Sequence, residues 1–556
     1  MSAADRSAEY DAVVVGAGHN GLVAANLLAD AGWRVLVLEA AAGAGGAVST
    51  AEVTAPGYRS DLCSAFYPVG AASPVLRELD LAGYGLRWRH APLVLAHVLP
   101  DDRCAVLSRD VEETAASLDA FGAGDGDAWR AEVATWVNVR ADLIESLLRP
   151  FPPVRPAARL LRRLGTAEAL RFARFGLLSS RRYGEERFAG EGGRLLLAGN
   201  ALHTDLAPES AGGAVFGWLL SMLGQDVGFP VPEGGAGRLV DALAARLAAR
   251  GGELVCGTPV TEVTVAGGRA VGVRTAGGVR VAAARAVLAD VVAPRLYLDL
   301  VGAEHLPGRM VADLRRFHWD AATVKVDWAL SAPLPWTAEP ARRAGTVHLG
   351  VDLDGLTEFA AALATRRDPP NPFLLLGQMT TADPSRSPAG TESVWAYTHV
   401  PHRRGRTGES VQAVVDRMEG VIERHAPGFR DLVVGRYVQG PGDLERRNPS
   451  TVDGAINAGT AALHQELVLR PVPGLGRADT PVDRLYLAGA SAHPGGGVHG
   501  ACGANAARAA LARDRAGTGR LYAAGVRLAH RAVYGSTPPP AAINESSALV
   551  DLRQRR

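Results

Sequence analysis

The sequence predicts an α/β protein in which one domain, built on a parallel sheet, is interrupted by a second domain of mixed α+β structure. Three observations support this fold class. A strand, a glycine turn, a helix and a second strand fill residues 12–38; short strands return over 253–282; and a strand, a glycine-rich turn and a helix recur over 484–512. With 556 residues, the chain is long enough for two such domains.

The composition is that of a globular protein. Hydrophobic residues make up 47% and charged residues 21%, which excludes disorder as the main theme. The 59 basic residues balance 58 acidic ones for a net charge of +1, which argues against a nucleic-acid partner. All the basic residues are arginine except one, Lys325.

Cysteine spacing and the absence of a targeting pattern indicate a cytoplasmic protein. The four cysteines form no C-x-x-C pair and no zinc spacing, so no disulfide framework and no metal site are expected. The first residues, MSAADRSAEYD, lack the basic start and apolar run of a signal peptide. The longest apolar stretch, 211–224, is shorter than the roughly 20 residues that a membrane span needs.

The first element is a β-α-β unit with a nucleotide-binding turn. Strands are expected at 12–15 and 34–38, with a helix over 22–31 between them. The turn Gly16-Ala17-Gly18-His19-Asn20-Gly21 opens that helix, where free N–H groups and the helix dipole attract a pyrophosphate. Glu39 follows at the end of the second strand, where its carboxylate can accept hydrogen bonds from both ribose hydroxyls. This arrangement predicts a Rossmann-type dinucleotide site that disfavours a 2′-phosphate.

The nucleotide could be NAD or FAD. A second glycine run, Gly43-Ala44-Gly45-Gly46, follows Glu39 closely and suits a second approach of the backbone to a larger cofactor. It therefore favours FAD.

From this run onward the chain resembles a known family. The segment GAGHNGLVAANLLADAGWRVLVLEAAAGAGGAVST looks like the FAD fingerprint of phytoene desaturase-like (carotenoid desaturase-type) flavoproteins, within the amine oxidase superfamily. The resemblance implies a glutathione reductase-like domain that binds FAD non-covalently. The resemblance also implies that the cofactor is contacted by Gly16, Gly18, His19, Asn20, Gly21, Glu39, Ala40, Gly45, Gly46 and Ala47. The family often has arginine where this chain has Ala47.

Two later segments extend the resemblance. The run LYLAGASAHPGGGVHGACGANAA reads as strand, sharp turn and helix, and its glycines expose N–H groups. The resemblance implies that Gly489 and Ala490 lie near the phosphates or ribityl chain, and Gly496, Gly497 and Val498 near the isoalloxazine. A helix over 238–250 and strands from 253 to 282, with glycine-pair hairpin turns, resemble a third piece, which implies that the Val260 backbone meets the adenine.

These segments define the expected domains. Residues 1–67, 229–300 and 460–530 would form the FAD-binding domain, and 68–228, mostly helical, with 301–459 the substrate domain. Residues from 531 to 556 would form a C-terminal tail.

Lys325 is the candidate catalytic residue. It lies in the alternating segment Ala-Thr-Val-Lys-Val-Asp-Trp, which predicts a strand. In relatives a lysine on such a strand holds a water near flavin N5, and a buried lysine can lose its proton where arginine cannot. A solvated strand lysine is the alternative.

Other residues carry weaker signals. His493 and His499 flank the last glycines, and Cys502 is expected to be a packed thiol rather than a covalent flavin link. His203, Phe216 and Trp218 fall in a region that the family uses for its substrate cavity. Nine arginines interleaved with Leu and Phe over 149–182 fit either a solvated helix face or a surface that lies on an anionic membrane.

The sequence therefore predicts an FAD-dependent oxidoreductase. Hydride would leave a C–H bond of an apolar substrate, an isoprenoid, polyene or related specialised metabolite, to form a double bond, with oxygen or a quinone as electron acceptor. An amine oxidase forming C=N is the runner-up, followed by a redox-neutral FAD-dependent isomerase and a flavin-binding scaffold without turnover.

Overall fold

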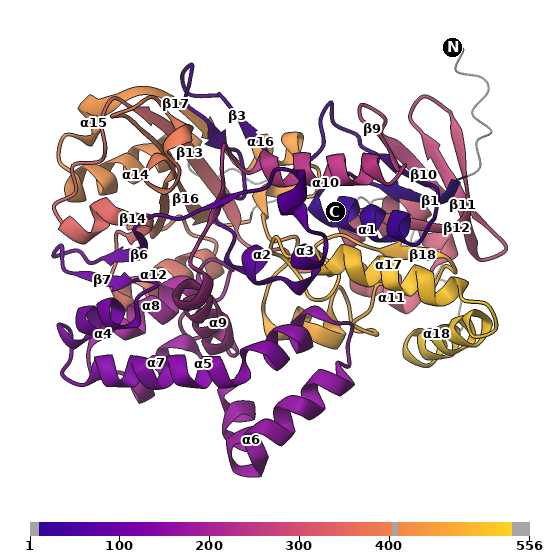
Figure 1. Cartoon of the computed structure of the whole chain (residues 1–556), viewed down its shortest axis with the longest axis horizontal. Helices are drawn as coiled ribbons and strands as arrows, with labels where there is room; N and C mark the ends of the chain where they lie inside the picture. Colours follow the sequence, from indigo (N-terminus) through magenta and orange to yellow (C-terminus); the bar gives the residue numbers. More distant parts are fainter. Residues whose placement is uncertain (1–9, 403–409, 536–556) are drawn as a thin grey trace, which may run out of the picture.

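The computed structural model describes residues 10–402 and 410–535, which form two large sheets with helices around them (Figure 1). One sheet takes its strands from residues 10–38, 253–289 and 485–487, and the other from 93–107, 322–400 and 433–439. The chain therefore crosses between the two sheets several times. The domain boundaries drawn from the sequence stay a prediction.

The first sheet has a parallel core. Its parallel strands lie in the order β9 (Glu253–Val255), β2 (Val35–Leu38), β1 (Tyr10–Val15), β12 (Arg280–Ala289) and β18 (Leu485–Leu487). The central strands β1 and β2 are almost fully buried, as is typical of a parallel sheet covered on both faces.

Three helices cover one face of this sheet (Figure 1). They are α1 (His19–Asp30), α10 (Gly237–Ala249) and α17 (Ala501–Asp514), and α1 lies between the other two. The contact between α1 and α17 depends on Gly503, where an added Cβ would lie 1.9 Å from the Asn20 carbonyl oxygen. Any larger residue would push the helix that follows the glycine turn away from α17.

A hairpin continues the sheet on one side. The strands β10 (Val260–Ala266) and β11 (Arg269–Thr275) are antiparallel, and the predicted turn at Gly267-Gly268 has positive φ at both residues. The strand β12 is longer than the predicted 279–282. Its first residues pair antiparallel with β11, and it then runs on parallel to β1, so one strand serves two kinds of ladder.

The second sheet is mixed. Its order is β17 (Val433–Gln439), β13 (Ala322–Leu330), β16 (Glu392–Val400), β15 (Leu374–Gln378), β14 (Ala344–Leu349), β6 (Leu93–Val98) and β7 (Cys104–Leu107). The strands β6 and β7 come from the region that the sequence predicts as mostly helical. Their alternation is hidden because both faces of this sheet are buried, so β6 is apolar at nearly every position.

The two faces of this sheet differ in chemistry. Val326, Trp328 and their neighbours form an apolar face that packs on α14 (Val411–His425). The opposite face carries polar and aromatic side chains, among them Lys325, Thr346, His348, Trp395 and Tyr397, and all of the five except Tyr397 are almost fully buried. Burying polar side chains costs folding free energy unless hydrogen bonds or a ligand compensate for the hydration that they lose.

Helices fill the space below this polar face (Figure 1). They are α4 (Val111–Asp119), α5 (Asp125–Leu148), α6 (Val154–Phe175), α7 (Ser180–Arg187), α8 (Glu191–Ala201) and α9 (Gly213–Val227). In Figure 1, α6 is the helix that lies farthest out at the bottom of the view. No helix among the described residues has the length and apolarity to cross a membrane.

The C-terminal end differs from the prediction at its start. The helix α18 (Gly519–Tyr534) continues past residue 530, so residues 531–534, expected in the tail, are helical. The rest of the predicted tail, from 536, lies outside the described residues.

Candidate active site

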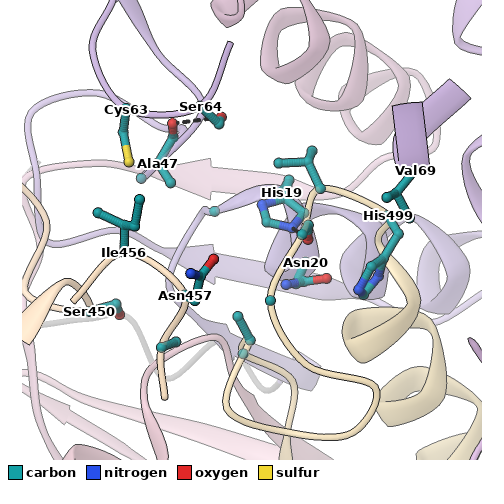
Figure 2. Close-up of a pocket in the computed structure, with 18 of the residues that line it drawn as sticks. His19, Asn20, Ala47, Cys63, Ser64, Val69, Ser450, Ile456, Asn457 and His499 are labelled. Carbon is teal, nitrogen blue, oxygen red and sulfur yellow. Dashed lines mark hydrogen bonds between the residues drawn. The ribbon is translucent and has the colours of Figure 1, made fainter. Parts of the chain in front are cut away.

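A cavity of about 990 Å³ lies between the two sheets and takes walls from both. It is lined by the glycine turn after β1, by the C-terminal glycine run, and by side chains of α5, α9 and β16. Figure 2 shows its polar part, where His19 and Asn20 lie between the loop carrying Ile456 and Asn457 and the side chain of His499.

The predicted cofactor residues converge on this cavity. Those that line it are Gly16, Gly18, His19, Asn20, Glu39, Ala40, Gly46, Ala47, Val260, Gly489, Ala490, Gly496, Gly497 and Val498. Gly21 and Gly45 do not line it and instead shape the turns. A Cβ on Gly21 would lie 2.2 Å from the Gly16 carbonyl oxygen, and Gly45 has φ +130 with the Val48 carbonyl oxygen 2.4 Å from an added Cβ.

Glu39 is held rigidly at the end of β2. Its two carboxylate oxygens accept hydrogen bonds from the backbone N–H groups of Ala17 at 2.7 Å and Ala41 at 2.8 Å. The carboxylate thereby links the glycine turn to the second glycine run while still lining the cavity. Val260 reaches the cavity from β10.

The two N-terminal glycine runs touch each other. The Gly45 N–H donates to the Ala17 carbonyl at 2.9 Å, and an added Cβ on Gly46 would lie 3.7 Å from the Gly18 Cα. Next to them, Ala47 accepts a hydrogen bond from the Ser64 hydroxyl through its carbonyl oxygen, as drawn in Figure 2.

The C-terminal run closes the cavity from the other side. An added Cβ on Gly489 would lie 2.5 Å from the Val291 carbonyl oxygen, so only glycine fits there. The His19 ring donates from Nε2 to the Gly497 carbonyl at 3.2 Å and so ties the first glycine turn to the last.

The three histidines around these turns are neutral at neutral pH. Burial lowers the pKa of His19 and of His493 to about 4 and that of His499 to about 3. His493 donates from Nε2 to the Arg149 carbonyl, and His499 accepts the Ala501 N–H through Nδ1. All three hold backbone groups in place.

Asp290 is a site residue that sequence reasoning missed. It directly follows β12, lines the cavity and accepts the Gly21 N–H through Oδ2 at 2.8 Å. Burial raises its pKa to about 7, opposed by that hydrogen bond and reinforced by the charge of Glu39. A signal was available, because ligands of parallel sheets bind outside the carboxyl ends of the strands.

The buried guanidinium group of Arg470 holds the backbone of the C-terminal glycine run in place. Arg470 is 1% exposed and donates to the carbonyl oxygens of Thr460 and Ala490, each at 3.0 Å, and to Glu466 at 2.8 Å. Burial raises the pKa of Glu466 to about 7, against the lowering effect of Arg470. The arginine therefore fixes the segment that carries Ala490 on the cavity wall.

Lys325 projects from the same face of the second sheet as Trp395 and Tyr397 but is not among the residues that line the cavity. The Nζ atom is 2.5 and 2.6 Å from the two carboxylate oxygens of Asp327 and 5.8 Å from the centroid of the Trp395 ring. The side chain is buried, so the solvated-lysine alternative is wrong. A catalytic role for Lys325 stays a prediction.

An apolar arm of the cavity runs away from the glycine turns. Its walls include Leu143 and Leu147 of α5 and Leu219 and Leu223 of α9. His203 and Phe216 line it, whereas Trp218 packs elsewhere and donates its indole N–H to Glu132 at 2.8 Å. Trp395 and Tyr397 of β16 form its floor, and nothing in the sequence singles them out.

Cys502 fits the expectation of a packed thiol. It is fully buried, and Sγ lies 3.5 Å from the carbonyl oxygens of Ala492 and Gly495. Burial raises the pKa of the thiol to about 12, so it is not a nucleophile. Within 10–402 and 410–535 no cluster of His, Cys, Asp or Glu could hold a metal ion.

The polar part of the cavity suits a flavin dinucleotide. Asn20 Oδ1 and Asn457 Nδ2 are buried without a hydrogen-bond partner, and both residues line the cavity. Unpaired buried amide atoms are costly: Asn457 Nδ2 needs an acceptor, which a phosphate or flavin oxygen would provide, and Asn20 Oδ1 needs a donor, which a flavin ring N–H would provide. An added Cβ would lie 2.7 Å from the Asp290 carbonyl oxygen at Gly16 and 2.5 Å from Asp290 Oδ2 at Gly18, so both positions stay glycine and the turn lines the cavity with bare backbone.

The chain is similar to known flavoproteins over most of its length. The family model for flavin-containing amine oxidoreductases matches residues 21–511. The chain is 30% identical over 545 residues to rat pyridine nucleotide-disulfide oxidoreductase domain-containing protein 2, covering 90% of this chain and 93% of that protein. It is 25% identical to the neurosporene-forming phytoene desaturase of Cereibacter sphaeroides, covering 90% and 94%.

The fold has a close counterpart among solved structures. A putrescine oxidase variant superposes with a TM-score of 0.59 at 17% identity, covering 91% of this chain and 99% of that one. The predicted α/β fold with a Rossmann-type domain and a second, substrate-binding domain is confirmed, as is the resemblance to phytoene desaturase-like proteins. The chain therefore belongs to the flavin-containing amine oxidoreductase family, as an oxidoreductase whose cofactor is a flavin.

Proposed function

We propose that this protein uses FAD to remove hydride from a C–H bond of a mainly apolar substrate and so forms a C=C bond. One observation carries the proposal: an apolar arm, walled by α5, α9 and β16, is continuous with the glycine-lined part of the same cavity. A substrate in that arm lies next to the predicted cofactor site, among apolar side chains. The similarity to phytoene desaturases supports the same reaction class.

The dinucleotide FAD fits better than a mononucleotide flavin. Glu39 and Val260 line the cavity at the far side of the glycine turn, where an adenosine would need them. A mononucleotide has neither the second phosphate nor the ribose that this turn and this carboxylate recognise. Gly16, Gly18 and the α1 N-terminus would hold the pyrophosphate, and Gly496 to Val498 would lie against the flavin ring.

The protein's own groups set the conditions for the reaction. When bound, FAD supplies a hydride acceptor. The leucines of α5 and α9 exclude water from the arm, and the neutral histidines around the glycine turns introduce no charge. We assign the proton that leaves the substrate to the Lys325–Asp327 pair beside Trp395, and because neither side chain lines the cavity, the proton would pass through a bridging water.

Amine oxidation is the second candidate, supported by the family's name and by the likeness to putrescine oxidase. One feature of the arm disfavours it. The rings of Trp395 and Tyr397 are nearly parallel, with centroids 5.9 Å apart. A group held between two aromatic faces needs about 7–8 Å, because each contact takes about 3.5–4 Å, so these two rings do not form a cage for an amine.

We also propose that α6 rests on an anionic membrane and brings apolar substrate to the cavity. Leu161, Leu170 and Leu177 are 56–69% exposed on or beside α6, among exposed arginines such as Arg162. The same helix places Phe172 on the cavity wall. A basic surface with exposed leucines suits an anionic bilayer.

The visible spectrum of the purified protein tests the proposed reaction. Recorded without oxygen, a yellow protein that bleaches on addition of a polyene or isoprenoid supports dehydrogenation, whereas bleaching by amines alone supports C=N formation. A compound that rearranges while the flavin stays oxidised identifies an isomerase. Re-oxidation by air or by an added quinone then names the electron acceptor, and a protein that takes up no FAD rejects the proposal.

A further inference from the structure

Two polar atoms among the residues that line the cavity have no hydrogen-bond partner in the protein. Asn200, at the end of α8, and Thr346, on β14, are each 1% exposed, and both line the cavity. Asn200 Oδ1 and Thr346 Oγ1 are buried without a hydrogen bond. Since nearly all buried polar atoms in proteins are paired, two unpaired atoms that line the same cavity indicate a bound molecule that pairs them.

The local hydrogen bonds fix which atom of Asn200 faces the cavity. The Ser221 hydroxyl donates to the Leu196 carbonyl at 3.3 Å, so its oxygen can only accept from Asn200 Nδ2, at 2.9 Å. The amide oxygen is therefore the free group of Asn200. An oxygen acceptor requires a donor, which a hydrocarbon does not have.

A third polar group lines the same cavity. His203 follows α8 by two residues, lines the cavity and shares a hydrogen bond of 2.8 Å between its Nε2 and that of His348. His348 lies two residues from Thr346 on β14, so both side chains project from the same face of the sheet. Burial lowers the pKa of His203 to about 3, so the ring is neutral.

The charge of these three groups limits the ligand. Asn200, Thr346 and His203 provide neutral donors and acceptors, and none of them could balance an ammonium or a carboxylate buried beside it. A carbonyl group could accept from Thr346 but could not donate to Asn200 Oδ1. A hydroxyl group does both.

We infer that Asn200, Thr346 and His203 form a subsite for a hydroxyl group, so that the substrate is an alcohol with an apolar, isoprenoid-like body rather than a pure hydrocarbon. The inference rests on the proposed function, because it takes the apolar arm to be the substrate site. It narrows the substrate class to molecules with one neutral polar end. A pocket built to pair a hydroxyl discriminates strongly against the analogue that lacks it.

Binding measurements with two matched probes test the subsite. Farnesol and farnesene share an isoprenoid chain and differ in the hydroxyl group. Isothermal titration calorimetry of the oxidised holoprotein is expected to give an affinity for farnesol at least about tenfold above that for farnesene. Equal affinities would overturn the inference, because water would then satisfy the two orphan atoms as well as the alcohol does.

Two variants and a control locate the preference. Asn200→Leu and Thr346→Val each remove one polar group at similar volume and are expected to weaken farnesol about tenfold, with farnesene within about twofold. Leu220→Met, elsewhere on the cavity wall, should affect both probes alike. A farnesol preference that survives in both variants would overturn the assignment. Thermal melts and flavin content identify a variant that fails to fold, and the other variant then decides.

The same experiment separates this inference from the proposed reaction. Calorimetry needs no turnover, so selective farnesol binding without bleaching by any compound would reject the dehydrogenase proposal and leave the subsite standing. Bleaching by a hydrocarbon, in a protein that binds farnesol and farnesene equally well, would reject the subsite and leave the dehydrogenase proposal standing.

Discussion

At the scale of single residues, Asp290 is a buried carboxyl group that accepts a hydrogen bond from the glycine turn. Its pKa is raised to about 7, chiefly by burial, from an ordinary value of 3.8. A carboxyl group whose pKa is raised by folding stabilises the folded state most at low pH. That contribution is full below about pH 4 and is lost as the pH rises through about 7.

Asp290→Asn removes this titration and keeps an acceptor for the Gly21 N–H. We expect the free energy of unfolding of the parent protein to fall relative to that of the variant by about 1.4 kcal/mol for each pH unit between about pH 4 and about pH 7, and its melting temperature to fall with it. Differential scanning fluorimetry across this range measures the difference. Asp241→Asn, on the exposed face of α10, is the control. If the melting temperatures of the parent and of Asp290→Asn change with pH in parallel, the raised pKa of Asp290 is contradicted.

Substitution of Lys325 tests whether the buried Lys325–Asp327 ion pair takes part in the reaction. We expect Lys325→Met to bind FAD, because the side chain does not line the cavity, and to slow flavin reduction by about a hundredfold, as loss of a proton-transfer group does. Stopped-flow absorbance measures the rate. Lys325→Met with Asp327→Asn removes the unpaired carboxylate and should recover the melting temperature but not the rate. A normal rate in Lys325→Met would leave the pair with a structural role only.

At the scale of elements, the strand–turn–helix unit at the N-terminus depends on backbone approach. Gly21→Ala places a methyl group 2.2 Å from the Gly16 carbonyl oxygen, so the turn must open and α1 must shift. We expect flavin content, measured as the ratio of visible to ultraviolet absorbance, to fall at least about tenfold. Gly525→Ala, on the exposed face of α18 and away from the cavity, is the matched control, since nothing lies within 4 Å of its added Cβ. Full flavin content in Gly21→Ala would show that the turn does not bind the cofactor.

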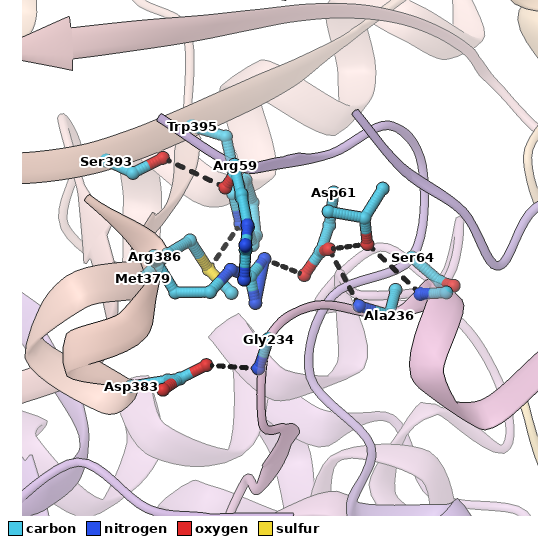
Figure 3. Close-up of polar contacts among 12 residues, drawn as sticks. Arg59, Asp61, Ser64, Gly234, Ala236, Met379, Asp383, Arg386, Ser393 and Trp395 are labelled. Atoms are coloured by element: carbon cyan, nitrogen blue, oxygen red, sulfur yellow. Dashed lines mark hydrogen bonds and ion pairs between the residues drawn. The ribbon is translucent and has the colours of Figure 1, made fainter. Parts of the chain in front are cut away.

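At the scale of the whole molecule, a fully buried ion pair joins the segment after the second glycine run to the second sheet (Figure 3). Arg386 Nη2 lies 2.5 Å from Asp61 Oδ2, and both side chains are 0% exposed. Asp61 also accepts hydrogen bonds from Thr50 and from the Ala236 N–H. The carboxylate therefore anchors three separate parts of the chain.

Arg386→Met leaves this carboxylate uncompensated, and we expect it to cost about 3–5 kcal/mol of folding free energy. Arg89→Met removes an exposed pair with Glu233 and should cost less than about 1 kcal/mol. Chemical denaturation followed by tryptophan and by flavin fluorescence measures both variants. Equal small losses would show that the buried pair is not a structural anchor.

The outer surface of α6 provides a test of the proposed membrane contact. We expect the protein to co-sediment with phosphatidylglycerol vesicles and not with phosphatidylcholine vesicles, because arginines favour anionic lipid. Leu161→Ser with Leu170→Ser should abolish co-sedimentation and leave the thermal melt unchanged, since both leucines are exposed. Binding that survives these changes would place the contact on another surface.

Predictions from the sequence were most accurate where chemistry is local. The first β-α-β unit, the hairpin turns and the strand at 485–487 follow from spacing and glycine placement over a few residues. The strands β6 and β7 were missed because both faces of their sheet are buried, which removes the alternation that identifies a strand. Trp395 and Tyr397 could not be found because aromatic residues on a buried strand look like any core.

The sequence by itself determined the class of cofactor site, because a glycine turn between a strand and a helix, followed by an acid, has few other uses. Only the tertiary structure decided which groups face the cavity. Asp290, Asn200 and Thr346 line the cavity from three separate parts of the chain, whereas Lys325, prominent in the sequence, pairs with Asp327 and does not line it. The physical reason is that burial and pairing depend on neighbours distant in the chain, and sequence spacing carries no record of those neighbours.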